Sequence, residues 1–224
     1  MTVTEAFQEF KSGLELPAAH SHRASAAQQA LRERLSRHLA IEDSFLTGSY
    51  ARHTKIHPLN DIDVILVRNV SRVGLVSSGG IQTFQALDEV VRAARSAFPT
   101  GATISKQSRS INVSFAGLDF GFDLIPSWLR QPDGYWIPDG DTGSWIATSP
   151  EFHEQFMTQA NDRTGGRLKP IVKMLKHWSR NNYDLLRSFH IELICENVSR
   201  SLRLDNFQLG VGTVLINLPH FIGV

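Results

Sequence analysis

Two aspartates separated by one isoleucine stand at the start of an apolar run. They are Asp61 and Asp63, and the β-branched residues up to Val67 follow them, a pattern typical of a strand buried in a sheet. Side chains two apart on a strand point to the same face, so we expect both carboxylates to project together. Two like charges at that distance repel unless a cation lies between them. Carboxylate oxygen is a ligand that Mg²⁺ prefers, so the spacing indicates a magnesium-binding pair.

A third carboxylate would complete a centre for two metal ions. The segment DFGFDLIP offers Asp119 and Asp123, and we choose Asp123 because a charged residue in the apolar part of a strand needs a special reason to be there. Two metals held by Asp61, Asp63 and Asp123 could serve an in-line displacement at phosphorus, one lowering the pKa of an attacking hydroxyl and the other neutralising a leaving pyrophosphate. Alone, an Asp-x-Asp pair is more often a helix cap or a solvated turn.

Phosphate-binding features lie on both sides of this constellation. Gly48 and Ser49 follow a short strand and open a predicted helical turn, where exposed backbone N–H groups can cradle phosphate oxygens. Further along, Lys173 and Lys176 share one face of a predicted helix, opposite apolar residues. A solvated basic face is the alternative interpretation of these lysines.

The spacing of apolar residues, together with the positions of Gly and Pro, predicts the helices and strands that must position these residues. The first part of the chain alternates helices and strands, and the part after residue 150 is helical, so the fold class is α+β. The stretch at 131–150, rich in Gly, Pro and Asp, is predicted to be a long connector. Helices are predicted at 4–14, after Pro17, and at 81–98, 150–160, 169–180, 188–202 and 206–218, and strands at 44–47, 62–67, 110–115 and 119–125.

Composition narrows the class of protein. Of 224 residues, 42% are hydrophobic and 20% are charged, which fits a folded globular chain and excludes disorder. The formal net charge of +1 gives no strong field, so we expect no long nucleic acid as a partner. Cys195 is the one cysteine, which excludes an intramolecular disulfide and a cysteine-based zinc site. No export signal or membrane span is recognised, so we expect a cytoplasmic protein with no membrane partner.

The sequence resembles a known family in three segments. They read GSYARHTKIHPLNDIDV, then YWIPDGDTGSWIATSPEFHEQF, then RLKPIVKMLKHW followed by SFHIE. The spacing of Gly48, Ser49, Asp61, Asp63 and Asp123 is similar to the signature of the polymerase-β-like nucleotidyltransferase superfamily. The three segments taken together resemble the bacterial CD-NTases, the cGAS-like and oligoadenylate-synthetase-like enzymes of antiphage (CBASS) signalling. The resemblance extends from about Phe7 to the end of the chain.

The resemblance implies a fold and an activity. A nucleotidyltransferase core of mixed sheet and helices, residues 1–148 with an N-terminal spine helix, would pack on a helical, oligoadenylate-synthetase-like domain, residues 149–224, that ends earlier than in the family. The enzyme would join ATP, GTP or another NTP into a cyclic or linear oligonucleotide second messenger with Mg²⁺, or alternatively Mn²⁺. Either a partner protein would activate it or its activity would be constitutive, and the messenger would act on a separate effector.

The resemblance also implies roles for individual residues. Asp61 and Asp63 would bind both metals, and Asp123 would bind the metal that activates the acceptor hydroxyl. The implied nucleotide-binding residues are Gly48 and Ser49, which would hold the triphosphate, Lys173 and Lys176, which would grip the donor triphosphate, and Ser188, which would contact phosphate.

Three alternatives remain open at the level of sequence. An RNA-terminal transferase of the poly(A) or CCA-adding kind predicts a basic RNA-binding surface, which a net charge of +1 disfavours. A catalytically silent nucleotide-binding module would have little reason to keep three carboxylates that are electrostatically costly without metal. A minimal nucleotidyltransferase antitoxin would be shorter than this chain.

Overall fold

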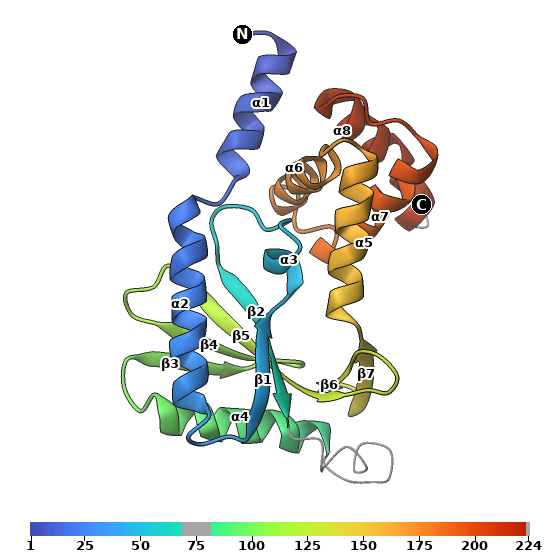
Figure 1. Ribbon diagram of the computed structural model, residues 1–224. Coiled ribbons are helices and arrows are strands. Elements are labelled where there is room, and N and C mark those ends of the chain that lie inside the picture. Colours follow the sequence, from blue (N-terminus) through green and yellow to red (C-terminus); the bar gives the residue numbers. More distant parts are fainter. Residues whose placement is uncertain (69–81, 223–224) are drawn as a thin grey trace. The chain divides into compact units, whose positions relative to one another are not determined.

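The computed structural model describes residues 1–68 and 82–222 (Figure 1). The chain forms two compact units. The sheet unit comprises Pro17–Gly48 and Leu59–Glu151, and the helical unit comprises Met1–Leu16, Ser49–Pro58 and Phe152–Val224. This division differs from the single boundary predicted at 148/149, because the first helix and the segment after Gly48 make their contacts within the helical unit. As an assignment of family domains, the predicted boundary stays a prediction.

The sheet unit is built on a mixed sheet in which β2 and β5 pair in parallel. The strands run in the order β1-β2-β5-β4-β3, and β6 pairs with both β5 and β7. A parallel neighbour requires a crossover connection, and the described part of the chain between β2 and β5 contains a helix and two further strands. The bounds are β1 Ile41–Leu46, β2 Asp61–Arg68, β3 Ala102–Lys106, β4 Ile111–Phe115, β5 Gly121–Leu129, β6 Tyr135–Asp139 and β7 Ser144–Thr148.

Two helices of the sheet unit, α2 and α4 (Figure 1), bury one apolar side each. In α2 (Ala18–Leu35), Leu31 and Leu35 are buried. In α4 (Thr83–Ala97), the apolar residues three and four apart are buried, and the helix contacts β3, β4, β5 and β6. Helical spacing predicts both buried sides, except that Phe84, which the same spacing places on the apolar side of α4, is 51% exposed. The predicted start of the second at Ile81 lies outside the described residues.

The predicted connector at 131–150 is wrong over most of its length. Residues in this stretch form the hairpin β6–β7, and Trp136 lies opposite Trp128 on β5 and Ala147 on β7. The Trp128 and Trp145 rings make an edge contact with centroids 5.1 Å apart. Aromatic cross-strand packing stabilises a hairpin, and it outweighs the Gly and Asp residues that sit in its turns. The short strand β3 was also not predicted from the sequence.

The helical unit contains α1 and the helices after β7, with two apolar clusters at its centre. One cluster gathers buried residues of α5, α6, α7 and α8 around Ile171 and Cys195. The other joins Leu14 of α1, Ile56 and Met174 of α6, so α1 and the segment that contains Ile56 belong to this unit. The bounds are α1 Val3–Leu14, α5 Pro150–Arg163, α6 Leu168–Arg180, α7 Ser188–Ser201, α8 Phe207–Asn217 and α9 Pro219–Ile222.

The fold class is α+β, as predicted. The four-residue α3 (Gly48–Ala51) begins at the last residue of one segment of the sheet unit and continues into the helical unit. Among the described residues, no helix combines the length and apolar character needed to cross a bilayer.

Candidate functional site

The three predicted carboxylates lie on the paired strands β2 and β5. Asp63 is the register partner of Asp123, and Asp61 is the partner of Gly121. Their strand neighbours, including Ile62 and Phe122, are fully buried, whereas the aspartates are half-buried. Because alternate residues of a strand share a face, all three carboxylates belong to one face of the sheet. The structure therefore places Asp61, Asp63 and Asp123 on one face of two adjacent strands.

A residue that the sequence analysis missed connects two of these carboxylates. Asn112 on β4 is the register partner of Asp123. Its amide Nδ2 donates to Oδ1 of Asp61 and to Oδ1 of Asp123, both at 2.9 Å. Gly121 leaves room for this contact, since a Cβ there would lie 3.2 Å from Oδ1 of Asp61 and 3.3 Å from Nδ2 of Asn112. One amide thus fixes the separation of two carboxylates from different strands.

Gly48 lies against the third carboxylate. The Thr47 N–H donates to the Asp63 carbonyl at 2.8 Å, so the chain leaves β1 beside Asp63. At Gly48 φ is +66°, and a Cβ built there would lie 2.6 Å from Cγ of Asp63 and closer still to its Oδ2. A side chain is therefore excluded for two reasons, the left-handed backbone and the space that the carboxylate occupies.

The donor set suits a hard divalent cation. Carboxylate oxygens are the ligands that Mg²⁺ uses, and the Asn112 amide takes up one oxygen each of Asp61 and Asp123. Within residues 1–68 and 82–222, no group of three or more His, Cys, Asp or Glu side chains is already arranged to hold a metal ion. The metal-binding role of the three aspartates stays a prediction.

Asp119, which the sequence analysis set aside, has a different environment. Its carboxylate is exposed and forms an ion pair with Arg23 at 3.2 Å. It precedes β5 and does not lie on the strand that carries Asp123.

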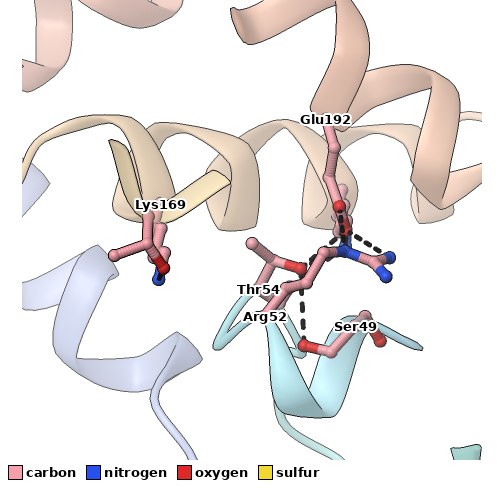
Figure 2. A network of polar contacts seen from close by, with 7 residues as sticks. Ser49, Arg52, Thr54, Lys169 and Glu192 are labelled. Atoms are coloured by element: carbon pink, nitrogen blue, oxygen red, sulfur yellow. Dashed lines mark hydrogen bonds and ion pairs between the residues drawn. The ribbon is translucent and has the colours of Figure 1, made fainter. Parts of the chain in front are cut away.

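A buried charge cluster occupies the helical unit (Figure 2). Glu192 on α7 is completely buried. Its carboxylate accepts from Nε of Arg52, from Oγ1 of Thr54 and from Nζ of Lys176 on α6, each at 2.6 Å. The backbone N–H of Thr54 in turn donates to the Ser49 carbonyl at 2.9 Å. The segment that follows Gly48 is thereby fixed to α6 and α7 by a network whose polar groups are paired, as burial requires.

Opposing effects set the pKa values in this cluster. Burial alone would raise the pKa of Glu192, but Lys176 and Arg52 outweigh it and hold the pKa below its ordinary value. Burial lowers the pKa of Lys176, and Glu192 opposes that change. Burial, followed by the charge of Arg52, also lowers the pKa of His153 on α5.

The predicted phosphate-binding lysines are both engaged. Lys176 is 3% exposed, and its ammonium donates to the Thr54 carbonyl at 3.2 Å and to Oγ1 of Thr54 at 3.1 Å as well as to Glu192. An ammonium has three donors, so Lys176 has none left for a phosphate in this arrangement. Lys173 forms an ion pair with Glu15. Ser188 is the exposed first residue of α7. Their phosphate-binding roles stay predictions.

The comparisons with known proteins identify the family. The model of the Second Messenger Oligonucleotide or Dinucleotide Synthetase domain, SMODS, matches residues 1–161. The chain belongs to the SMODS family. The resemblance to CD-NTases seen in the sequence is thereby confirmed.

Curated relatives of this SMODS protein are cyclic nucleotide synthases. It is 29% identical over 199 residues to a cyclic AMP-AMP-AMP synthase of an Acinetobacter species, a match that covers 84% of this chain and 55% of the relative. It is 30% identical over 179 residues to the CBASS oligonucleotide cyclase CdnC of Escherichia coli, covering 75% of this chain and 55% of the relative. The chain therefore spans about half the length of the curated relatives it matches.

Solved structures share the SMODS fold. CdnC of E. coli MS115-1 with ATP superposes with a TM-score of 0.78 at 21% identity and covers 97% of this chain and 72% of its own. The apo form of Vibrio cholerae DncV superposes with a TM-score of 0.73 at 13% identity and covers 94% of this chain and 75% of its own. A complex of the same CdnC with a HORMA protein is also known, with a TM-score of 0.76 at 21% identity, covering 96% of this chain and 71% of its own. At these identities the likeness concerns the fold.

Proposed function

We propose that this chain is a divalent-metal-dependent nucleotidyltransferase that joins nucleoside triphosphates into a cyclic or linear oligonucleotide second messenger, with Mg²⁺ as the metal, in antiphage (CBASS) signalling. Membership of the SMODS family and relatives named as cyclic nucleotide synthases support the reaction class.

The observation that carries the proposal is the row of carboxylates on β2 and β5. Three acidic side chains on one face of adjacent strands repel one another. The fold nevertheless pairs Asp63 in register with Asp123. It also has no room at Gly48 for a side chain, which would displace Asp63. Such an arrangement costs free energy in the metal-free protein. A bound cation would offset that cost, so the row of carboxylates favours a metal-binding site.

The residues of the chain have distinct tasks in the proposed reaction. A divalent metal bound by Asp61, Asp63 and Asp123 would supply activation of an acceptor hydroxyl and neutralisation of triphosphate charge. Asn112 holds Asp61 and Asp123 at a fixed separation before the substrate arrives, so little reorganisation is needed when it binds. Gly48 keeps the chain close to Asp63 without displacing the carboxylate.

The remaining roles are proposed on the resemblance. Ser49 would contact the triphosphate together with Gly48, and Lys173 and Ser188 would contact phosphate oxygens. Lys176 would have to leave its contacts with Glu192 and Thr54 to do the same. A variant that removes Lys173 alone is expected to raise the KM for the triphosphate, because a single phosphate contact is lost.

The test is a product survey with purified chain. It is incubated with all four labelled NTPs and Mg²⁺ or Mn²⁺, treated with phosphatase, and separated. We expect a phosphatase-resistant product that is absent from Asp61→Ala/Asp63→Ala. The double variant is expected to fold, since removing repelling carboxylates need not destabilise the metal-free protein.

A second measurement separates the possible failures. Mn²⁺ binding by the wild-type chain, followed by electron paramagnetic resonance, reports on the carboxylates without turnover. Metal binding without product would contradict the proposed activity but would support the proposed metal site. Product formation that survives in Asp61→Ala/Asp63→Ala would contradict the site assignment.

A further inference from the structure

A pocket in the helical unit is lined by four arginines. It has a volume of about 290 Å³ and lies where α5 joins α6 and where α7 leads to α8. None of its residues belongs to the sheet unit, which holds Asp61, Asp63 and Asp123. The lining residues are Arg163, Thr164, Arg167, Ser199, Arg200, Ser201, Leu202, Arg203, Leu204 and Asp205.

Three of the four guanidinium groups are held in place by the protein. Arg163 and Arg200 both donate to Glu196 at 2.8 Å, and that carboxylate is buried, with 3% of its side chain exposed. Nε of Arg167 donates to the Leu204 carbonyl at 2.7 Å. The terminal nitrogens of Arg167 lie 3.3 Å from where a Cβ on Gly165 would be, so its guanidinium rests against a backbone turn. These arginines are ordered before any ligand binds.

The fixed guanidinium groups keep donors for a ligand. A guanidinium has five N–H donors. In the hydrogen bonds between described residues, Arg167 and Arg200 use only Nε, and Arg163 uses one terminal nitrogen. Arg203 is exposed and forms no hydrogen bond or ion pair with the described residues. The forked N–H groups that suit phosphate oxygens therefore remain available.

The charge around the pocket exceeds what the fold needs. Two guanidinium groups, those of Arg163 and Arg200, already surround the carboxylate of Glu196. Arg167 and Arg203 add two more positive charges, against Asp205 in the lining. In a chain whose formal net charge is +1, four guanidinium groups beside two carboxylates are a local excess of positive charge. Like charges held together in this way attract a multivalent anion.

We propose that this pocket binds a small phosphate-bearing anion, of the size of pyrophosphate or of a nucleotide's phosphate chain. Its volume lies at the lower end of the range of about 300–1,000 Å³ that holds small molecules, so it admits a phosphate chain and excludes a large oligonucleotide. Bidentate contacts from ordered arginines give recognition of phosphate. The site is independent of the proposed nucleotidyl transfer, because its residues are separate from the carboxylate row.

The test measures binding of sodium pyrophosphate, and in a parallel arm ATP, to the full chain by calorimetry at low ionic strength. EDTA is present, so that no divalent metal can bring phosphate to the carboxylates. The variants are Arg203→Gln, whose side chain forms no hydrogen bond or ion pair with the described residues, and Arg167→Gln/Arg203→Gln. Arg92→Gln on α4 of the sheet unit removes the same charge from an exposed position and serves as the matched control.

We expect the wild type and Arg92→Gln to bind pyrophosphate equally, Arg203→Gln to bind about tenfold more weakly, and the double variant to lose binding. Asp61→Ala/Asp63→Ala should bind like the wild type. Similar affinities for pyrophosphate and ATP would support recognition of the phosphate chain alone, and tighter binding of ATP that Arg167→Gln/Arg203→Gln abolishes would assign the site to a nucleotide. Wild-type binding that Arg203→Gln and Arg92→Gln weaken equally, or no binding by the wild type, would overturn the proposal.

Discussion

A single methyl group at Gly48 provides a sharp test of the carboxylate row. In Gly48→Ala the new Cβ would lie 2.6 Å from Cγ and 3.0 Å from Cβ of Asp63, well inside van der Waals contact. The Asp63 side chain must therefore move or the chain between β1 and α3 must shift. The left-handed φ of +66° adds a backbone cost.

The matched control is Gly143→Ala in the turn between β6 and β7. Gly143 has a φ of +69°, and a Cβ there would meet no atom within 4 Å. Both variants therefore carry the backbone penalty of about 1–2 kcal/mol for a non-glycine residue in this region. Gly48→Ala adds about 0.5–1.5 kcal/mol if Asp63 is forced out of its rotamer. The difference in the free energy of unfolding between the two variants isolates the cost of displacing Asp63.

The expected functional difference is larger than the difference in stability. A shift of about 1 Å in a catalytic group can reduce the rate about 100-fold, so we expect Gly48→Ala to lose about that factor in nucleotidyl transfer, with weaker Mn²⁺ binding. Gly143→Ala should keep both. Urea denaturation gives the stability, and labelled NTP incorporation gives the rate. Equal activity in the two variants would refute the reasoning that Gly48 protects the position of Asp63.

Asn112→Leu should lower Mn²⁺ affinity and the transfer rate, because Asp61 and Asp123 lose their shared donor, whereas Asn112→Gln should be partly active; equal metal affinity in both would contradict this. Glu192→Gln should lower the free energy of unfolding, measured by urea denaturation, by about 3–5 kcal/mol, because it leaves Lys176 with a weaker partner in a buried cluster. A free energy of unfolding equal to that of the wild type would contradict the role of the cluster. The folded-state pKa of Glu192 is depressed below its ordinary 4.5, so its stabilisation is complete above that pH and is lost as pH falls through the folded-state value; the wild type should lose more stability in acid than Glu192→Gln, and parallel pH profiles would contradict that sign. Burial raises the pKa of the Cys195 thiol, so it should react with a thiol reagent only on unfolding, and rapid labelling of the native chain would show that the core around it opens.

The sequence predicted the carboxylates and their shared face from local rules. Alternation along a strand is enough to place Asp61 beside Asp63, and an acidic residue between Phe122 and Leu124 marks Asp123. The register that sets Asp63 opposite Asp123 depends on strand pairing across most of the sheet unit, which local patterns do not encode. Asn112 was missed although a polar residue between Ile111 and Val113 carries the same signal that marked Asp123.

The charge cluster shows a second limit of local patterns. Helical spacing predicted that Lys173 and Lys176 share a face, but the identity of their partners depends on tertiary contacts. Glu192 follows Ile191 on the buried side of α7, and a buried carboxylate requires a cation. Spacing alone does not reveal that Arg52, 140 positions away in the chain, is one of them.

The hairpin β6–β7 was missed because its turn residues dominate the composition of the stretch. Gly134 and Gly143 have positive φ, so they mark turns correctly. The strand that follows each glycine is rich in apolar residues, with Trp136 and Ile137 on β6 and Trp145 on β7, and this aromatic and β-branched content would have been the useful signal.

The most direct test of the central claim compares Asp123→Asn with Asp119→Asn. Both changes remove one carboxylate charge within a few residues of each other, but Asp123 lies on β5 beside Asp63 and Asp119 is exposed on the surface. The measurement is the rate of Mg²⁺-dependent formation of phosphatase-resistant product from labelled NTPs. The account predicts that Asp119→Asn keeps the wild-type rate and that Asp123→Asn loses it by at least about 100-fold. Equal rates in the two variants would contradict the account.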